Sequence, residues 1–143
     1  MSSELDARYR LRLAMGFQQE AEQDFQLQRW RSCVDNAQLS VENFGKAIIA
    51  LFEPAQKTRN PAIQLRELIK KNRVDAALLS DLNAMLDAFD EFGFAKHFMT
   101  DYGDEESYCD PWAIFGEKDT HKALETMRTC LALSEQCFRF YHA

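Results

Sequence analysis

The sequence predicts an all-α protein, an antiparallel up-and-down bundle of four long helices plus one short helix. Its 143 residues include only five glycines and three prolines, so helix breakers are sparse. Apolar residues recur at spacings of three and four along most of the chain. The polar segments between these stretches are mostly short, and short connections favour antiparallel neighbours. We expect one domain over residues 1–143, long enough to bury roughly 70% of the unfolded chain's surface.

The first helix is expected over residues 4–27 and the second over residues 29–53. Within the first, the stretch "RYRLRL" alternates like a strand, but it is short and flanked by helix formers. The second has the most regular apolar stripe in the chain, at alternating spacings of four and three. The stripe consists of Trp30, Val34, Ala37, Val41, Phe44, Ile48 and Leu51.

No glycine or proline separates these two helices, so a single helix of about fifty residues is the alternative. The phase of the stripe argues against it. After Phe25 a continuing stripe would fall on the polar Gln28 and Arg29, yet it restarts at Trp30. At 100° per residue, that step turns the apolar face by roughly 140°. We therefore place a tight turn near Gln26 to Arg29.

A short third helix is expected over residues 61–72, after a polar loop that follows Pro54. Asn60 is a good N-cap, and Pro61 fits the first helical position, where its missing N–H leaves no bond unmade. Asn72 closes this helix.

The fourth helix is expected over residues 76–99, capped by Asp75 and weakened at Gly93. The last is expected over residues 120–142, with Asp119 as its N-cap.

Composition limits the function classes. A net charge of −6 and a pI near 5.1 disfavour DNA and general nucleic-acid binders, although a local basic groove stays open. No apolar run reaches the length of a membrane span. The cysteines form no C-x-x-C pair, so we expect reduced thiols, a cytoplasmic protein, no metal site and no cofactor. They are Cys33, Cys109, Cys130 and Cys137.

The stretch "RWRSCVDNAQLSVENFGKAIIALF" resembles the second helix of HEPN domains. The match lies on Ala37, Gln38, Val41, Glu42, Lys46, Ala47 and Leu51. The later stretch "TRNPAIQLRELI" is similar to a segment that often follows in this family. "TDYGDEESYCDPWAIFGEKDTHKALETM" resembles the family's tyrosine-proline-acid corner before the last helix.

The resemblance implies a helical bundle, commonly a homodimer. Such domains are associated with RNA cleavage, with nucleotide binding, or with pairing to a small nucleotidyltransferase in toxin–antitoxin modules. The family's ribonucleases use an R-x(4–6)-H motif, since histidine moves protons near neutral pH and arginine holds a phosphate.

This sequence departs from that motif. Asp101 stands where many relatives have arginine, and a carboxylate there would repel RNA. No arginine occurs from Val74 through Thr126, and no other arginine precedes a histidine at the required spacing. We therefore predict no catalytic residues.

The segment between the last two long helices is rich in carboxylates and aromatic rings. Its carboxylates could hold Mg²⁺, remain a solvated loop, or dock to a basic partner surface. Its rings, including Tyr108 and Phe115, could instead pack over the end of the bundle. The candidate binding residues are Lys46, His97, Asp101, Tyr102, Asp104, Trp112 and His121.

Each basic candidate has a plainer interpretation. Lys46 points away from the apolar stripe and can pair with Glu42, or it can contact a nucleotide phosphate. His97 is either a general base or a partner of Asp101 at the helix end. His121 is expected to be a solvated first-turn residue.

These observations favour a non-catalytic binding or assembly module. Its expected partners are a second copy of the chain, a nucleotidyltransferase-type protein, or a nucleotide. One alternative is an RNA-cleaving enzyme with a divergent active site, and another is a purely structural helical subunit.

Overall fold

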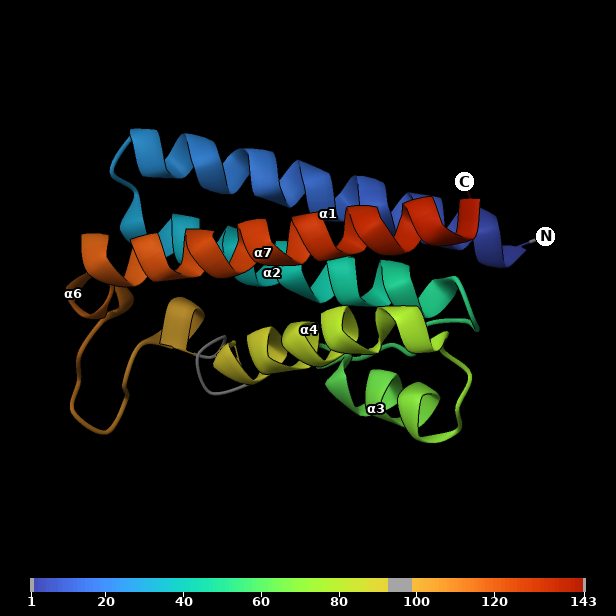
Figure 1. Cartoon of the computed structure of the whole chain (residues 1–143). Coiled ribbons are helices and arrows are strands. Elements are labelled where there is room, and N and C mark those ends of the chain that lie inside the picture. Colours follow the sequence, from blue (N-terminus) through green and yellow to red (C-terminus); the bar gives the residue numbers. More distant parts are fainter. Residues whose placement is uncertain (1, 93–98, 143) are drawn as a thin grey trace.

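The computed structural model describes residues 2–92 and 99–142 of the chain. Its regular elements in these ranges are helices, apart from one isolated bridge between Asp104 and Cys109, so the predicted all-α class is confirmed. The four longest helices lie side by side, and successive ones run in opposite directions (Figure 1). They are α1 (Ser2–Gln26), α2 (Trp30–Ala50), α4 (Leu79–Glu91) and α7 (Glu117–His142).

The turn between α1 and α2 lies where the sequence predicts it. α1 ends at Gln26, α2 begins at Trp30, and Gln28 takes a positive φ of 58°. The buried carboxylate of Asp24 holds this turn. It accepts hydrogen bonds from Ser32 Oγ at 2.7 Å and from Asn36 Nδ2 at 2.8 Å.

Helix α2 is the centre of the bundle. Every residue from Asn43 to Ala50 is buried, which requires neighbours on all sides of the helix. Gly45 lies so close to the side chains of Phe89 and Pro61 that a Cβ atom there would clash with both. Lys46, which the periodicity places away from the apolar stripe, is only 7% exposed, so that side of α2 is covered as well.

Two of the three predicted caps bind the expected backbone amides. Asn60 Oδ1 accepts from Ala62 N, where α3 (Ala62–Lys70) begins. Asp75 Oδ1 accepts from Ala77 N in the short helix η1 (Ala76–Leu78), which leads into α4. α4 ends at Glu91, so the single helix predicted over residues 76–99 is wrong at its end.

The third predicted cap, Asp119, has a different role. α7 begins at Glu117, so Asp119 lies inside its first turn. Its Oδ2 accepts from the Gly116 amide at 3.2 Å, which is the reverse bond of a capping box. No helix in the described ranges is long and apolar enough to cross a bilayer.

Candidate functional site

A pocket of about 450 Å³ opens at the end of the bundle where α1 turns into α2. The short helix α6 (Pro111–Ile114) lies at the same end (Figure 1). The pocket combines two tryptophans with two arginines. Its lining residues are Gln28, Arg29, Trp30, Arg31, Ser32, Trp112 and Phe115.

Arg31 ties the α6 segment to α2. Its Nη1 donates to the Thr100 carbonyl at 2.9 Å, and its guanidinium carbon lies 5.5 Å from the centroid of the Trp112 ring. A cation–π contact of this kind is worth about 0.5–1 kcal/mol at an exposed site. Trp112 is nevertheless 73% exposed, so most of its ring stays accessible from the pocket.

Arg29 supplies a cation at the start of α2. Its side chain is 65% exposed and lies 4.0 Å from the Asp24 carboxylate, which already accepts from Ser32 and Asn36. The first turn of α2 contains no acidic residue. Because a helix N-terminus carries partial positive charge, this rim of the pocket favours an anion.

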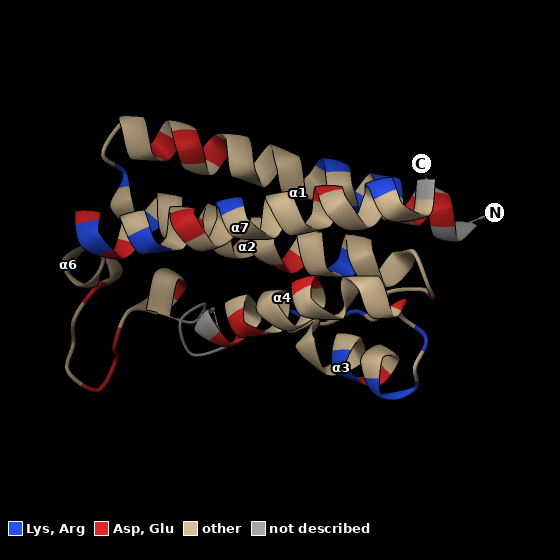
Figure 2. Cartoon of the chain, viewed as in Figure 1, with Lys and Arg blue, Asp and Glu red and all other residues tan. Residues whose placement is uncertain are grey.

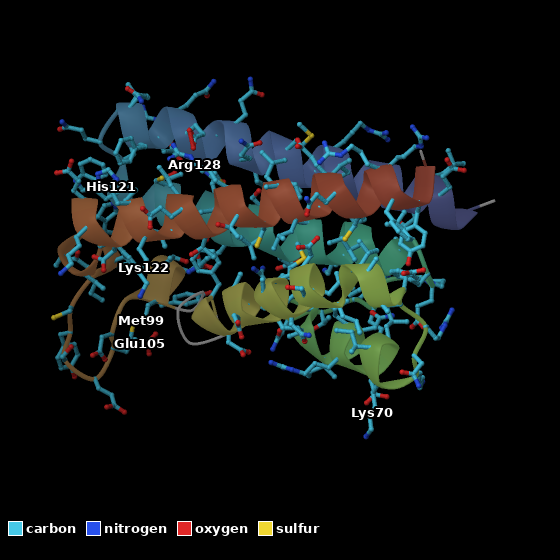
Figure 3. The ribbon with its side chains drawn as sticks, in the orientation of Figure 1. Lys70, Met99, Glu105, His121, Lys122 and Arg128 are labelled. Carbon is cyan, nitrogen blue, oxygen red and sulfur yellow. The ribbon has the colours of Figure 1, made fainter. Side chains whose placement is uncertain are left out.

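His121 is separated from the pocket residue Trp30 by the ring of Phe25. The Phe25 ring meets Trp30 edge-on at a centroid distance of 5.6 Å and His121 at 4.9 Å. His121 is exposed, and its Nε2 lies 3.8 Å from Glu117 Oε1 in the first turn of α7 (Figure 3). Its neighbours are therefore a phenyl ring and a carboxylate, which is consistent with the expected solvated first-turn residue.

Lys46 is not brought to this pocket. Its Nζ lies 3.0 Å from Glu42 Oε2, so the predicted pair within one helix turn is confirmed. It is sixteen residues beyond Trp30 on α2, which corresponds to about 24 Å along the helix axis. His97 lies outside the described residues.

Residues 101–110, which we name the acidic loop, form a tight turn in which most side chains are exposed. Asp104 and Cys109 exchange backbone hydrogen bonds, and Gly103 takes a positive φ of 72° to start the turn. Asp101 and Tyr102 are exposed, and Tyr108 is 93% exposed. Packing over the bundle's end is therefore confirmed only for Phe115, which is buried.

The Asp104 carboxylate is held by a backbone amide of the same loop. Its Oδ1 accepts from Glu106 N at 3.1 Å. Within residues 2–92 and 99–142, no three His, Cys, Asp or Glu side chains gather into a group that could bind a metal ion.

Comparison with known proteins identifies the family. The model of the HEPN domain matches residues 7–137, which is nearly the whole chain. The chain belongs to the HEPN domain family. No curated protein matches the sequence.

The fold is also similar to a solved structure, the crystal structure of TT1696 from Thermus thermophilus. The two chains share 17% sequence identity with a TM-score of 0.69, over 92% of this chain and 97% of the other. At this identity the likeness shows the fold alone.

Among the predicted site residues of this HEPN domain that the structure describes, only Trp112 lines the pocket. Sequence reasoning missed Arg29 and Arg31, and it assigned Trp30 only to the apolar stripe. The signal was present in "RWR", because these letters directly follow the predicted turn. A turn places the first residues of the next helix at the end of the bundle, where side chains can face both core and solvent.

Proposed function

We propose that this chain is a non-catalytic HEPN module, a single domain over residues 1–143, that binds a nucleotide in the pocket beside α6. The observation that carries the proposal is the gathering of two tryptophans and two arginines around one opening at the N-terminus of α2. Aromatic rings and guanidinium groups are the side chains that proteins use to hold bases and phosphates.

Each part of a nucleotide has a matching group in the pocket. The exposed ring of Trp112 offers a face for a base, and such stacking is worth about 1–3 kcal/mol per base. Arg29 and the amino end of α2 can hold the phosphate. The Gln28 amide can both donate and accept, which suits the edge of a base.

The environment of His121 supports a module that does not cut RNA. Cleavage by this family's chemistry needs an imidazole and a guanidinium at one phosphate. His121 instead lies against Phe25 and near Glu117, and a carboxylate disfavours a phosphate there. We expect no cleavage of single-stranded RNA at high protein concentration. Cleavage that disappears in His121→Ala would instead favour the ribonuclease alternative.

Isothermal titration calorimetry against a panel of nucleoside mono- and triphosphates tests the proposal. We expect heat of binding for at least one member, and about tenfold weaker binding in Trp112→Ala, as loss of one stacked base predicts. Tyr108→Ala is the matched control, because it removes an exposed aromatic ring outside the pocket lining. An absence of heat with every nucleotide, or equal binding by wild type and Trp112→Ala, would contradict the proposal.

A protein partner is a second candidate, supported by the exposed rings of Tyr102 and Tyr108 among carboxylates. Aromatic residues are enriched at the centres of protein interfaces, and the surrounding negative charge suits a basic partner surface. A nucleotidyltransferase, as in toxin–antitoxin modules, is the partner that the family suggests. Affinity purification of the chain beside Tyr108→Ala tests it, and the partner should be lost from the variant alone.

A further inference from the structure

No contact with the described residues explains the glycine at position 16, in the middle of α1. A Cβ atom built on it meets no described atom within 4 Å, and the residue is exposed. Glycine in a helix interior costs about 1 kcal/mol relative to alanine. The packing of the described residues gives nothing in return for this cost.

Gly16 is also the centre of a symmetric row of exposed side chains. From residue 16 toward either end of the helix, the successive members of the row are spaced four, three and four residues apart. At 100° per residue, every member within α1 lies within roughly 40° of the direction of Gly16. The last member, Leu27, is the first residue after α1, and its amide still donates to the Gln23 carbonyl at 3.1 Å. The row, which we name the α1 outer face, is Leu5, Tyr9, Arg12, Gly16, Glu20, Gln23 and Leu27.

No described element covers this face. α1 packs on α2 and α7 along its other side and forms an edge of the bundle (Figure 1). Leu5 is 69% exposed and Leu27 is 60% exposed, so a large apolar side chain stands in water at each end of the row. Between them, the ring of Tyr9 lies beneath the Arg12 guanidinium at 5.8 Å.

The side chains of the row are complementary to those of a second copy that runs in the opposite direction. Consider two copies of α1 that lie antiparallel and cross at Gly16. Each residue of one copy then faces the residue of the other copy that is equally far from Gly16 on the opposite side, so that the two residue numbers add up to 32. Leu27 then faces Leu5, Gln23 faces Tyr9, and Glu20 faces Arg12. The wider charge pattern of α1 agrees only in part. The charged residues of its C-terminal half are all acidic, whereas its N-terminal half carries three arginines together with Glu4 and Asp6 (Figure 2).

We propose that the α1 outer face is a two-fold interface with a second copy of this chain. A two-fold contact requires that residue i meets j and that j meets i, which is the pairing just described. Gly16 lies at the crossing point, where a residue without a side chain lets the two backbones approach toward the short end of the usual 8–10 Å separation. This inference is independent of the nucleotide site.

Sedimentation velocity over a concentration series tests the proposal. We expect a dimer for the wild-type chain and a monomer for Gly16→Arg at the same concentration. The arginine should not disturb the fold, since a Cβ at Gly16 points into open space. Circular dichroism checks this point. A monomer at every concentration, or a dimer that persists in Gly16→Arg, would overturn the proposal.

Charge exchange tests the register of the two helices. Arg12→Glu places two acidic residues opposite each other at both ends of the crossing, and Glu20→Arg places two basic ones there. We expect each variant to dimerise about tenfold more weakly. An equimolar mixture should form heterodimers, and the double variant should dimerise like wild type. Glu125→Arg, an equal charge change on the exposed face of α7, is the matched control.

Recovery of dimerisation on mixing the two variants cannot come from a contact between residues 12 and 20 of the same chain. Residues 12 and 20 are separated by about 12 Å along α1, so their side chains are not neighbours on the same helix. Recovery in the mixture and in the double variant, with no change in Glu125→Arg, supports the proposal. Dimerisation that stays weak in both, or that never weakened in the single variants, refutes this pairing.

Discussion

Replacing Gly45 by alanine should destabilise the fold, although alanine is the better helix former. The added Cβ overlaps Cζ of the Phe89 ring and lies 2.8 Å from Cγ of Pro61, well inside normal carbon contact distances. Overpacking of this kind typically costs about 1–3 kcal/mol, and the two neighbours here place it near the upper value. The gain in helix propensity is about 1 kcal/mol. We expect a net loss of about 2 kcal/mol in the free energy of unfolding.

Urea denaturation followed by circular dichroism measures this change. With a slope of about 2 kcal/mol per molar urea, the midpoint should fall by about 1 M while the slope stays the same. A double-mutant cycle then tests the cause. In a Phe89→Leu background the ring atoms are gone, so Gly45→Ala should cost at least about 1 kcal/mol less.

An unchanged or higher midpoint for Gly45→Ala in the wild-type background would refute the argument from close packing. If the stability losses of Gly45→Ala and Phe89→Leu simply add in the double variant, the Phe89 ring is not what excludes a side chain at Gly45.

Three further changes follow from the buried polar groups and thiols. Asp24→Ala leaves the donors of Ser32 and Asn36 unpaired, so we expect a loss of about 2 kcal/mol in urea denaturation, and a loss under about 0.5 kcal/mol would contradict this role. Iodoacetamide at about pH 8 should modify only Cys109 in the folded chain and every cysteine after denaturation, as intact-mass spectrometry would show; early modification of a second thiol would contradict the burial. Above about pH 9 the free energy of unfolding should fall as pH rises, because the unfolded thiols ionise first; Cys130→Ala should show a shallower fall, and stability that rises with pH would be the contrary result. Both thiol predictions rest on burial, which raises the pKa of three thiols to about 12: Cys33, Cys130 and Cys137.

Local sequence signals predicted the parts of the fold that depend on local physics. The turn before Trp30 was found because a change in stripe phase is a property of neighbouring residues alone. Asn60 and Asp75 were recognised because a cap binds an amide two residues away. Asp119 was misplaced by a related pattern, since a carboxylate in the first turn can bind back to the residue that precedes the helix.

The parts that failed depend on which elements surround a residue. Periodicity places Lys46 opposite the apolar stripe of α2, but it does not reveal that other elements cover that side as well. The pocket was missed for the same reason. Trp30 and Trp112 are 82 residues apart in the sequence, and the Arg31 bond to the Thr100 carbonyl that brings their segments together spans 69 residues.

Both tryptophans of this chain line one opening. Emission from indole excited at the red edge of its absorption band therefore comes from that opening and from nowhere else in the molecule. The protein carries a built-in optical reporter there, with one fluorophore beside the phenyl ring of Phe25 and the other beneath a guanidinium. A change in colour or brightness on adding a small molecule would report on that end of the bundle without any label.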